Sequence, residues 1–184
     1  WRQRRAGGKG VGVPGLLRML ELSHKRHGRL PWARLFDRAI EMASKGFTVS
    51  PRLHAMIKRD RHLKNFSAAR SFFFTRDGEA LPIGTLIKNS ELANTLRQVA
   101  TKGANAFYTG AIAHDIAAAV SNTHHLPAKM TAADIALYQA KKRRILCHPY
   151  RQWRICGMPP PTSGGIAIAQ ILTMLEPYDQ IGRA

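Results

Sequence analysis

The stretch Met158-Pro-Pro-Pro-Thr-Ser-Gly-Gly165 stands directly before a strongly apolar segment near the end of the sequence. Each proline holds φ near −65°, so the three together favour a rigid turn. Ser163 is suited to cap the following helix, and Gly164 and Gly165 would let that helix pack closely on a strand. The alternative is an anion site for a carboxylate or phosphate at the helix N-terminus. A P-loop is excluded because no Gly-Lys-Ser/Thr follows the glycines. The predicted helix ends before Pro177, and its apolar residues are Ile166, Ile168, Ile171, Leu172 and Leu175.

Two short strands are predicted before this turn. They cover 144–148 and 152–156, and Pro149-Tyr150-Arg151 joins them as a β-hairpin, whose second strand is the one expected to receive the helix. Cys147 and Cys156 are the only cysteines. Two cysteines are too few for a disulfide scaffold, and their spacing fits no zinc site, so they say little about the redox compartment.

The earlier part of the chain is predicted to be mainly helical, because its apolar residues recur with a helical period. Ser50 is a natural N-cap, and Thr131 with Asp134 has the spacing of a capping box. The predicted helices cover 14–27, 31–46, a segment from 51, 90–101, 105–121 with a break at Gly110, and 132–141. Between them, Phe72-Phe73-Phe74 predicts a short strand and Asp77-Gly78 a turn.

Charge and composition limit the class of protein. The chain has 184 residues, 45% of them apolar, and a formal net charge of +18. These values exclude collagen, a coiled coil and wholesale disorder. No apolar run reaches the length of a membrane span, so none is expected. The charge raises binding to nucleic acid or another polyanion as a class. However, the basic residues are scattered, with the densest run at Lys141-Lys142-Arg143-Arg144, so a solvated basic surface is the simpler interpretation.

Local motifs identify no catalytic set. In Asn122-Thr123-His124-His125 a hydroxyl stands beside imidazoles, but a nucleophile and its base must approach in space, and neighbours in sequence rarely do. The eight histidines show no metal-ligand spacing, so no metal is assigned. We therefore assign no catalytic, substrate-binding or metal-ligating residue and no cofactor.

Several segments, taken in order, resemble the large-subunit region of the γ-glutamyltransferase (γ-glutamyltranspeptidase, glutathione hydrolase) family. The resemblance covers residues 11–179. It is carried by Gly12-Val-Pro-Gly15, 27–32, 39–40, 43–50, 52–53, 84–86, 92–96, Gly103, Phe107-Tyr-Thr-Gly110, 112–113, 130–134, Tyr138, 150–151 and the 158–165 stretch. Thr162 stands where the family has serine, and residues 1–10 do not match the family's lead-in.

This resemblance implies an α+β protein: a helix-rich part of the four-layer αββα fold of N-terminal-nucleophile hydrolases, with one β-hairpin towards its C-terminus. It implies a precursor that cuts itself, so that a new N-terminal threonine attacks the γ-glutamyl amide of glutathione or a related compound, with its own α-amine as general base. Water or an amino acid then accepts the γ-glutamyl group. Family members in bacteria are usually periplasmic or secreted. In this chain we expect residues 1–10 to be a loose basic lead-in and 11–184 to be part of the large-subunit domain.

The family's functional residues do not transfer to this chain. The nucleophile motif, Thr-Thr-His, lies beyond the proline block in the family, so we expect it in a separate small-subunit segment. The arginine that holds the substrate carboxylate precedes the Gly-Val-Pro-Gly segment, and Arg2, Arg4 and Arg5 match no motif there. No signal peptide is expected within a sequence that starts at Trp1. The 184 residues alone are predicted to be inactive. Several alternatives stay open. The chain could come from a divergent member, a disrupted gene or an expressed fragment of the family, or from a related β-lactam acylase. It could also be a basic polyanion-binding module or a non-enzymatic remnant of the fold.

Overall fold

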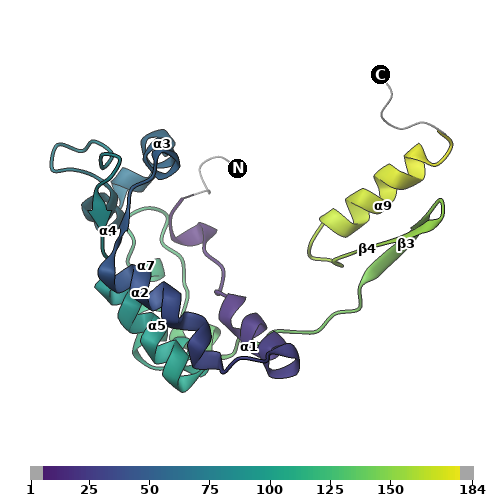
Figure 1. Cartoon of the computed structure of the whole chain (residues 1–184), viewed down its shortest axis with the longest axis horizontal. Helices are drawn as coiled ribbons and strands as arrows, with labels where there is room; N and C mark the ends of the chain where they lie inside the picture. Colours follow the sequence, from purple (N-terminus) through teal and green to yellow (C-terminus); the bar gives the residue numbers. More distant parts are fainter. Residues whose placement is uncertain (1–5, 179–184) are drawn as a thin grey trace. The chain divides into compact units, whose positions relative to one another are not determined.

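The structure is a computed structural model that describes residues 6–178. It divides into two compact units, with the boundary between Ala140 and Lys141. The first unit is built mainly of short helices, and the second is a β-hairpin with one helix (Figure 1). The α+β class, with helices first and a hairpin near the end, is confirmed.

The first unit contains eight α-helices, three 3₁₀ turns and two short strands within the described residues. Its elements in chain order are η2 (Gly8–Gly10), α1 (Leu16–His27), η3 (Trp32–Phe36), α2 (Asp37–Lys45), β1 (Phe47–Thr48), α3 (Pro51–Arg59), η4 (Leu63–Asn65), α4 (Ser67–Phe73), β2 (Leu86–Ile87), α5 (Ser90–Lys102), α6 (Asn105–Tyr108), α7 (Ala111–Ser121) and α8 (Ala132–Ala136).

The helix starts follow the sequence signals. The Ser50 side chain accepts a hydrogen bond from the Leu53 N–H at 3.1 Å, and Asn89 caps α5 in the same way. Thr131 and Asp134 form the predicted capping box, whose hydrogen bonds to the carboxylate lower the pKa of Asp134. Gly110, with φ +71°, separates α6 from α7 as expected. These caps satisfy N–H groups that a helix start leaves without partners.

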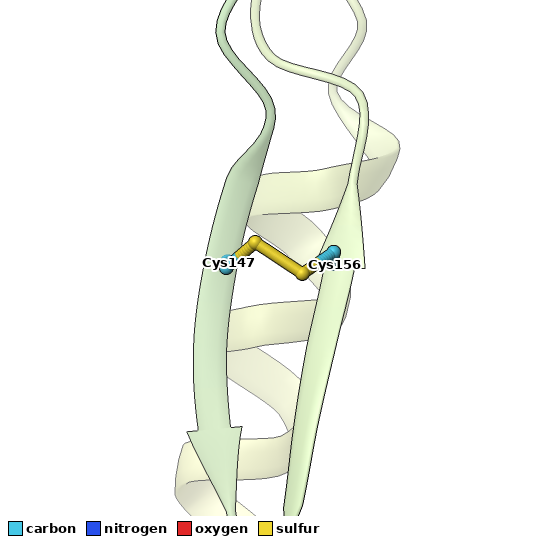
Figure 2. Close-up of a disulfide and its surroundings, with 2 residues drawn as sticks. All are labelled: Cys147 and Cys156. Carbon is cyan, nitrogen blue, oxygen red and sulfur yellow. A yellow bond between two sulfur atoms is a disulfide. The ribbon is translucent and has the colours of Figure 1, made fainter.

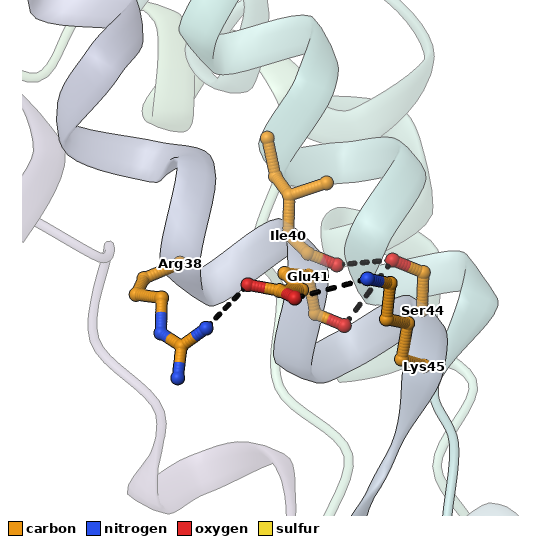
Figure 3. A network of polar contacts seen from close by, with 5 residues as sticks. All are labelled: Arg38, Ile40, Glu41, Ser44 and Lys45. Atoms are coloured by element: carbon orange, nitrogen blue, oxygen red, sulfur yellow. Dashed lines mark hydrogen bonds and ion pairs between the residues drawn. The ribbon is translucent and has the colours of Figure 1, made fainter.

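The charged face of α2 carries a small network around Glu41 (Figure 3). Arg38 and Lys45 donate to its two carboxylate oxygens, and Ser44 donates to the Ile40 carbonyl. The hydrogen bond from Lys45, followed by that from Arg38, lowers the pKa of Glu41. The opposite face of α2 packs against α5, with Ala43 and Val99 among the buried residues. Ion pairs at this spacing on an exposed helix face add little to stability, so packing holds the helix.

The structure corrects three expectations in this unit. Phe72 and Phe73 lie in α4, and only Phe74 forms an isolated bridge, to Ala80. The apolar run predicted a strand, but Phe73 packs against the cluster that contains the buried Phe74, and the Phe72 ring lies edge-on against the Phe73 ring. The pairing of β1 with β2 was not predicted, because each strand has two residues and no alternation to detect. Finally, α8 ends at Ala136, well before the predicted Lys141.

The described part of the N-terminal lead-in is tied to the body of the first unit. Gly8 N–H donates to the His125 carbonyl at 3.2 Å, and Lys9 N–H donates to the Leu126 carbonyl at 2.8 Å. Residues 1–5, which belong to the lead-in expected to be loose, lie outside the described residues.

The second unit consists of β3 (Leu146–Tyr150), β4 (Trp153–Gly157) and α9 (Gly164–Leu175). The strands pair antiparallel with Cys147 opposite Cys156, and these two form a disulfide (Figure 2). The helix lies on the other face of the hairpin, where the Thr173 hydroxyl and the His148 imidazole are 3.0 Å apart. The predicted hairpin is confirmed, shifted by one or two residues. The disulfide was missed by the sequence analysis, although cysteines nine residues apart on the two strands of a hairpin are suited to pair across it.

Among residues 6–178, no helix is long and apolar enough to cross a membrane.

Candidate functional site

The proline-glycine turn places the start of α9 against the end of β4. The Thr162 N–H donates to the Pro159 carbonyl at 3.2 Å, and the helix begins at Gly164. Ser163 occupies the N-cap position, but its side chain makes no capping hydrogen bond. The predicted cap is therefore wrong. The physical reason is the backbone at Ser163: with φ −78° and ψ −18° it is already helical, whereas a capping residue has an extended backbone that directs its oxygen at the free N–H groups.

Gly165 provides the close approach between helix and strand that the sequence predicted. A Cβ added there would collide with the Met158 carbonyl oxygen and lie 3.3 Å from the Gly157 carbonyl carbon. A Cβ added at Gly157 would lie 2.9 Å from the Gly165 Cα. The two glycines face each other, so any side chain at either position would push α9 away from β4. The contact falls one residue beyond the predicted strand. The alternative, an anion site at this helix start, stays a prediction.

A second set of motif residues converges in the first unit around Tyr108, which is fully buried. Its hydroxyl donates to the Pro14 carbonyl at 2.6 Å and accepts from the Arg18 N–H at 3.2 Å. The Arg18 guanidinium lies 4.4 Å from the ring centroid, and the Tyr138 ring stacks at 6.0 Å. Burial raises the pKa of Tyr108. Gly15 leaves room for Tyr138, since a Cβ there would collide with its ring.

Glu21 extends this cluster to the start of α6. Its carboxylate accepts from the buried Ala104 N–H at 3.0 Å and pairs with Lys25 at 3.2 Å. Burial disfavours the charged carboxylate, but these contacts outweigh that effect and lower the pKa of Glu21. The Gly-Val-Pro-Gly, Phe-Tyr-Thr-Gly and Tyr138 motifs thus hold one another in place. The sequence motifs include these residues, but their contacts were not predicted, because the members of each pair are separated by many positions.

The Asn122–His125 segment lies in the loop after α7. The Thr123 hydroxyl is 3.5 Å from the His125 N–H, and no hydrogen bond joins it to an imidazole within residues 6–178. Both histidine rings pack near Phe66, with centroids 5.8 Å and 6.5 Å from it. The arrangement contains no nucleophile–base pair.

The remaining sequence candidates are dispersed. In the described part of the chain, no three His, Cys, Asp or Glu side chains cluster as metal ligands would. The basic run Lys141–Arg144 is exposed and lies outside any helix or strand. No catalytic constellation is therefore assembled from the side chains that sequence analysis singled out.

The sequence of this chain is similar to those of known proteins. The profile of the family described as gamma-glutamyltranspeptidase matches residues 1–183. Glutathione hydrolase 2 of Arabidopsis thaliana is 33% identical over 176 residues, which cover 96% of this chain and 30% of that protein. The glutathione hydrolase proenzyme of Escherichia coli (strain K12) is 33% identical over 170 residues, covering 91% of this chain and 29% of that protein.

A solved structure agrees with this match. Helicobacter pylori gamma-glutamyltranspeptidase superposes with a TM-score of 0.87 at 31% identity, over 97% of this chain and 50% of that one. The chain spans about three tenths of the length of the two curated relatives. The family match over residues 1–183, together with this structural likeness along 97% of the chain, shows that this chain belongs to the gamma-glutamyltranspeptidase family.

Proposed function

We propose that this chain is part of the large-subunit region of an enzyme that cleaves γ-glutamyl amides, with glutathione or a related γ-glutamyl compound as substrate. The observation that supports the proposal is the family match over residues 1–183. Residues 11–184 form the framework in this proposal. The nucleophile belongs to a small-subunit segment of the parent protein.

The proposed chemistry is acyl transfer through a threonine. Its hydroxyl oxygen attacks the γ-glutamyl carbonyl while its α-amine takes the proton, and backbone N–H groups stabilise the tetrahedral oxyanion. The protonated α-amine gives this proton to the amine of the substrate, which leaves, and a γ-glutamyl ester remains on the threonine. Water or an amino acid then attacks the ester, takes the γ-glutamyl group and restores the threonine hydroxyl. The 184 residues contain no Thr-Thr-His sequence, so the chain alone lacks this route. We therefore propose that the isolated chain is catalytically inactive.

The Cys147–Cys156 disulfide supports an exported enzyme, periplasmic or secreted. Disulfides persist in oxidising compartments and are rare where glutathione and thioredoxin keep thiols reduced. Export of the parent protein is testable by fractionating cells that express it and alkylating free thiols before and after reduction. Finding both thiols free in protein recovered from the cell would contradict this part of the proposal.

The experiment that tests the activity compares the isolated chain with its parent coding region. We expect the parent to release p-nitroaniline from γ-glutamyl-p-nitroanilide and the 184-residue chain to give no more than a boiled control. An acylated β-lactam in a parallel assay separates the acylase alternative from the γ-glutamyl one. Turnover by the purified chain itself would contradict the proposal that the nucleophile lies in a small-subunit segment of the parent protein. If the parent protein is folded but inactive with both substrates, the result would favour the alternative that it is a non-enzymatic remnant of the fold.

A further inference from the structure

A pocket of about 520 Å³ lies in the first unit, outside the turn and the Tyr108 cluster. Its volume is in the range of small-molecule sites (~300–1,000 Å³). Three stretches of chain form it: the segment from η4 into α4, the turn after α4, and the loop after α7 that carries His124. The buried Phe74 supplies the apolar part of the wall. The γ-glutamyl chemistry proposed above makes no use of this pocket.

The charge of the lining has a single sign. Lys64, Arg70 and Arg76 line the pocket, and no Asp or Glu does. The four ion pairs found among residues 6–178 all involve other cations, so these three carry no carboxylate partner there. Three positive charges around one concave surface repel one another. An anion with several negative charges relieves that repulsion, and guanidinium groups bind oxyanions through two parallel hydrogen bonds.

Neutral donors accompany the cations. Thr75 Oγ1 accepts from the Glu79 N–H at 3.2 Å, which leaves its hydroxyl hydrogen to donate to a ligand. Ser67 lines the same pocket, and its hydroxyl has no partner among the described residues. The Ser71 hydroxyl is already used, because it donates to the Ala68 carbonyl at 3.0 Å. The pocket therefore offers two hydroxyl donors beside three cations, which suits a group with several oxygen acceptors.

The loop that carries His124 is held in a defined position. Gly8 and Lys9 donate to the carbonyls of His125 and Leu126, and Phe66 packs against the His124 ring. Leu126 has φ +47°, a conformation that costs free energy for a side chain of this size. Strained residues of this kind cluster at functional sites. The histidine that sequence analysis set aside as a catalytic base thus lines the basic pocket.

From these observations we infer that the pocket binds a small, multiply charged oxyanion, of the phosphate-ester or polycarboxylate class. Arg70 and Arg76 bind its oxygens, Lys64 adds charge, and the hydroxyls of Ser67 and Thr75 donate hydrogen bonds. A small ligand fits better than a nucleic acid because the cations surround one hollow and do not form an extended stripe.

The test is calorimetric titration of the full chain with pyrophosphate and, separately, with citrate, at about 150 mM salt where diffuse attraction is screened. Arg70→Gln and Arg76→Gln should each weaken binding about tenfold, as expected for loss of one charged, bidentate contact. Arg97→Gln is the matched control: it removes one cation from α5, where the Arg97 guanidinium donates to the Asn94 side chain at 2.8 Å. Ser67→Ala should weaken binding by a smaller factor.

The two probes identify the ligand class, since preference for pyrophosphate indicates a phosphate ester and preference for citrate a polycarboxylate. Either preference, lost in the pocket variants and retained in Arg97→Gln, supports the inference. If the chain gives the circular dichroism spectrum of a folded, helix-rich protein and binds neither probe, the inference is overturned. Equal losses in Arg70→Gln and Arg97→Gln also overturn it, as does binding of duplex DNA without binding of the small probes, because both outcomes assign the effect to net charge.

Discussion

The two units of the chain are stabilised in different ways. The first has a buried core, which includes Tyr108, Ile135 and Val99, and polar contacts that join distant segments. In the second, no described residue is buried, and two of its large apolar side chains, Trp153 and Met174, are more than 60% exposed. Its strands are held by backbone hydrogen bonds and one disulfide. A two-stranded hairpin is marginal by itself in water, so covalent and steric constraints matter more there than burial does.

The sharpest test of this contrast is Tyr108→Ala. Loss of a fully buried ring and its two hydrogen bonds should lower the free energy of unfolding of the first unit by about 3–5 kcal/mol. Tyr108→Phe should cost about 1–2 kcal/mol, because the ring stays and only the hydroxyl contacts are lost. Urea denaturation followed by circular dichroism measures both.

The matched control for Tyr108 lies in the second unit. The Tyr150 hydroxyl is buried and has no hydrogen-bond partner within residues 6–178. Tyr150→Phe should therefore be neutral or slightly stabilising, since it removes a desolvated polar group. If Tyr150→Phe destabilised the protein as much as Tyr108→Phe, the contrast between the two units would be wrong.

The next largest effect concerns the disulfide. Replacing Cys147 and Cys156 together by serine should lower the local stability of the hairpin by about 2–3 kcal/mol, because the unfolded chain regains the freedom of the loop closed between residues nine positions apart. Hydrogen exchange of the β3 and β4 amides measures this, with the α5 amides as internal reference. Dithiothreitol should cause the same loss of hairpin stability in the unmutated chain and should not change the double variant. Unchanged exchange on reduction would show that packing alone holds the hairpin.

A glycine substitution tests the steric constraint on the same unit. Gly165→Ala should cost about 1–3 kcal/mol, because the new methyl group meets the backbone of Met158 and Gly157. Gly164→Ala is the control, since its nearest neighbour would be a Thr162 methyl group at 4.0 Å. It should stabilise the helix slightly by restricting the unfolded chain. Equal costs at the two positions would refute the close approach of α9 and β4.

A pH-dependent effect is expected in the first unit, at Glu21. Because the folded-state pKa of Glu21 lies below its ordinary value, its stabilisation is present above that ordinary pKa, near 4.5, and is lost as pH falls through the lower folded-state value. At pH 7, Glu21→Gln should cost about 1 kcal/mol, and Glu21→Ala more, because alanine leaves the buried Ala104 N–H without an acceptor. The melting temperatures of the unmutated chain and of Glu21→Gln should converge as the pH falls from 4.5 through the folded-state pKa of Glu21. A constant difference from pH 7 to pH 3 would contradict the role of the charge.

The smallest effect compares two helix starts. Ser50→Ala removes a hydrogen bond to the Leu53 N–H and should cost about 1 kcal/mol. Ser163→Ala removes no capping hydrogen bond and should change stability by less than about 0.5 kcal/mol. Thermal melts of the two single variants suffice. A loss of 1 kcal/mol or more at Ser163 would mean that its side chain caps α9 in solution.

Local signals predicted local structure well and failed where a distant contact decides the outcome. The caps at Ser50 and Thr131 were found because each acts within three residues of its own helix. Phe72 and Phe73 were placed in a strand, although the structure packs them as part of α4. The same run of aromatic residues fits either conformation, and in the structure Phe73 packs from α4 onto the cluster of Ile57, Phe74 and Ala80 while Phe74 itself is extended.

What the sequence determined by itself was the succession of helices, the hairpin, the rigid turn and, through its ordered motifs, the family. Those features depend on residue types at short and fixed spacing. Only the tertiary structure decided that Glu21 reaches Ala104, that Pro14 meets Tyr108, and that Lys64, Arg70 and His124 share one pocket. These residues are separated by more than fifty positions in all but one case, and no periodicity encodes which segments the packing of the core brings together.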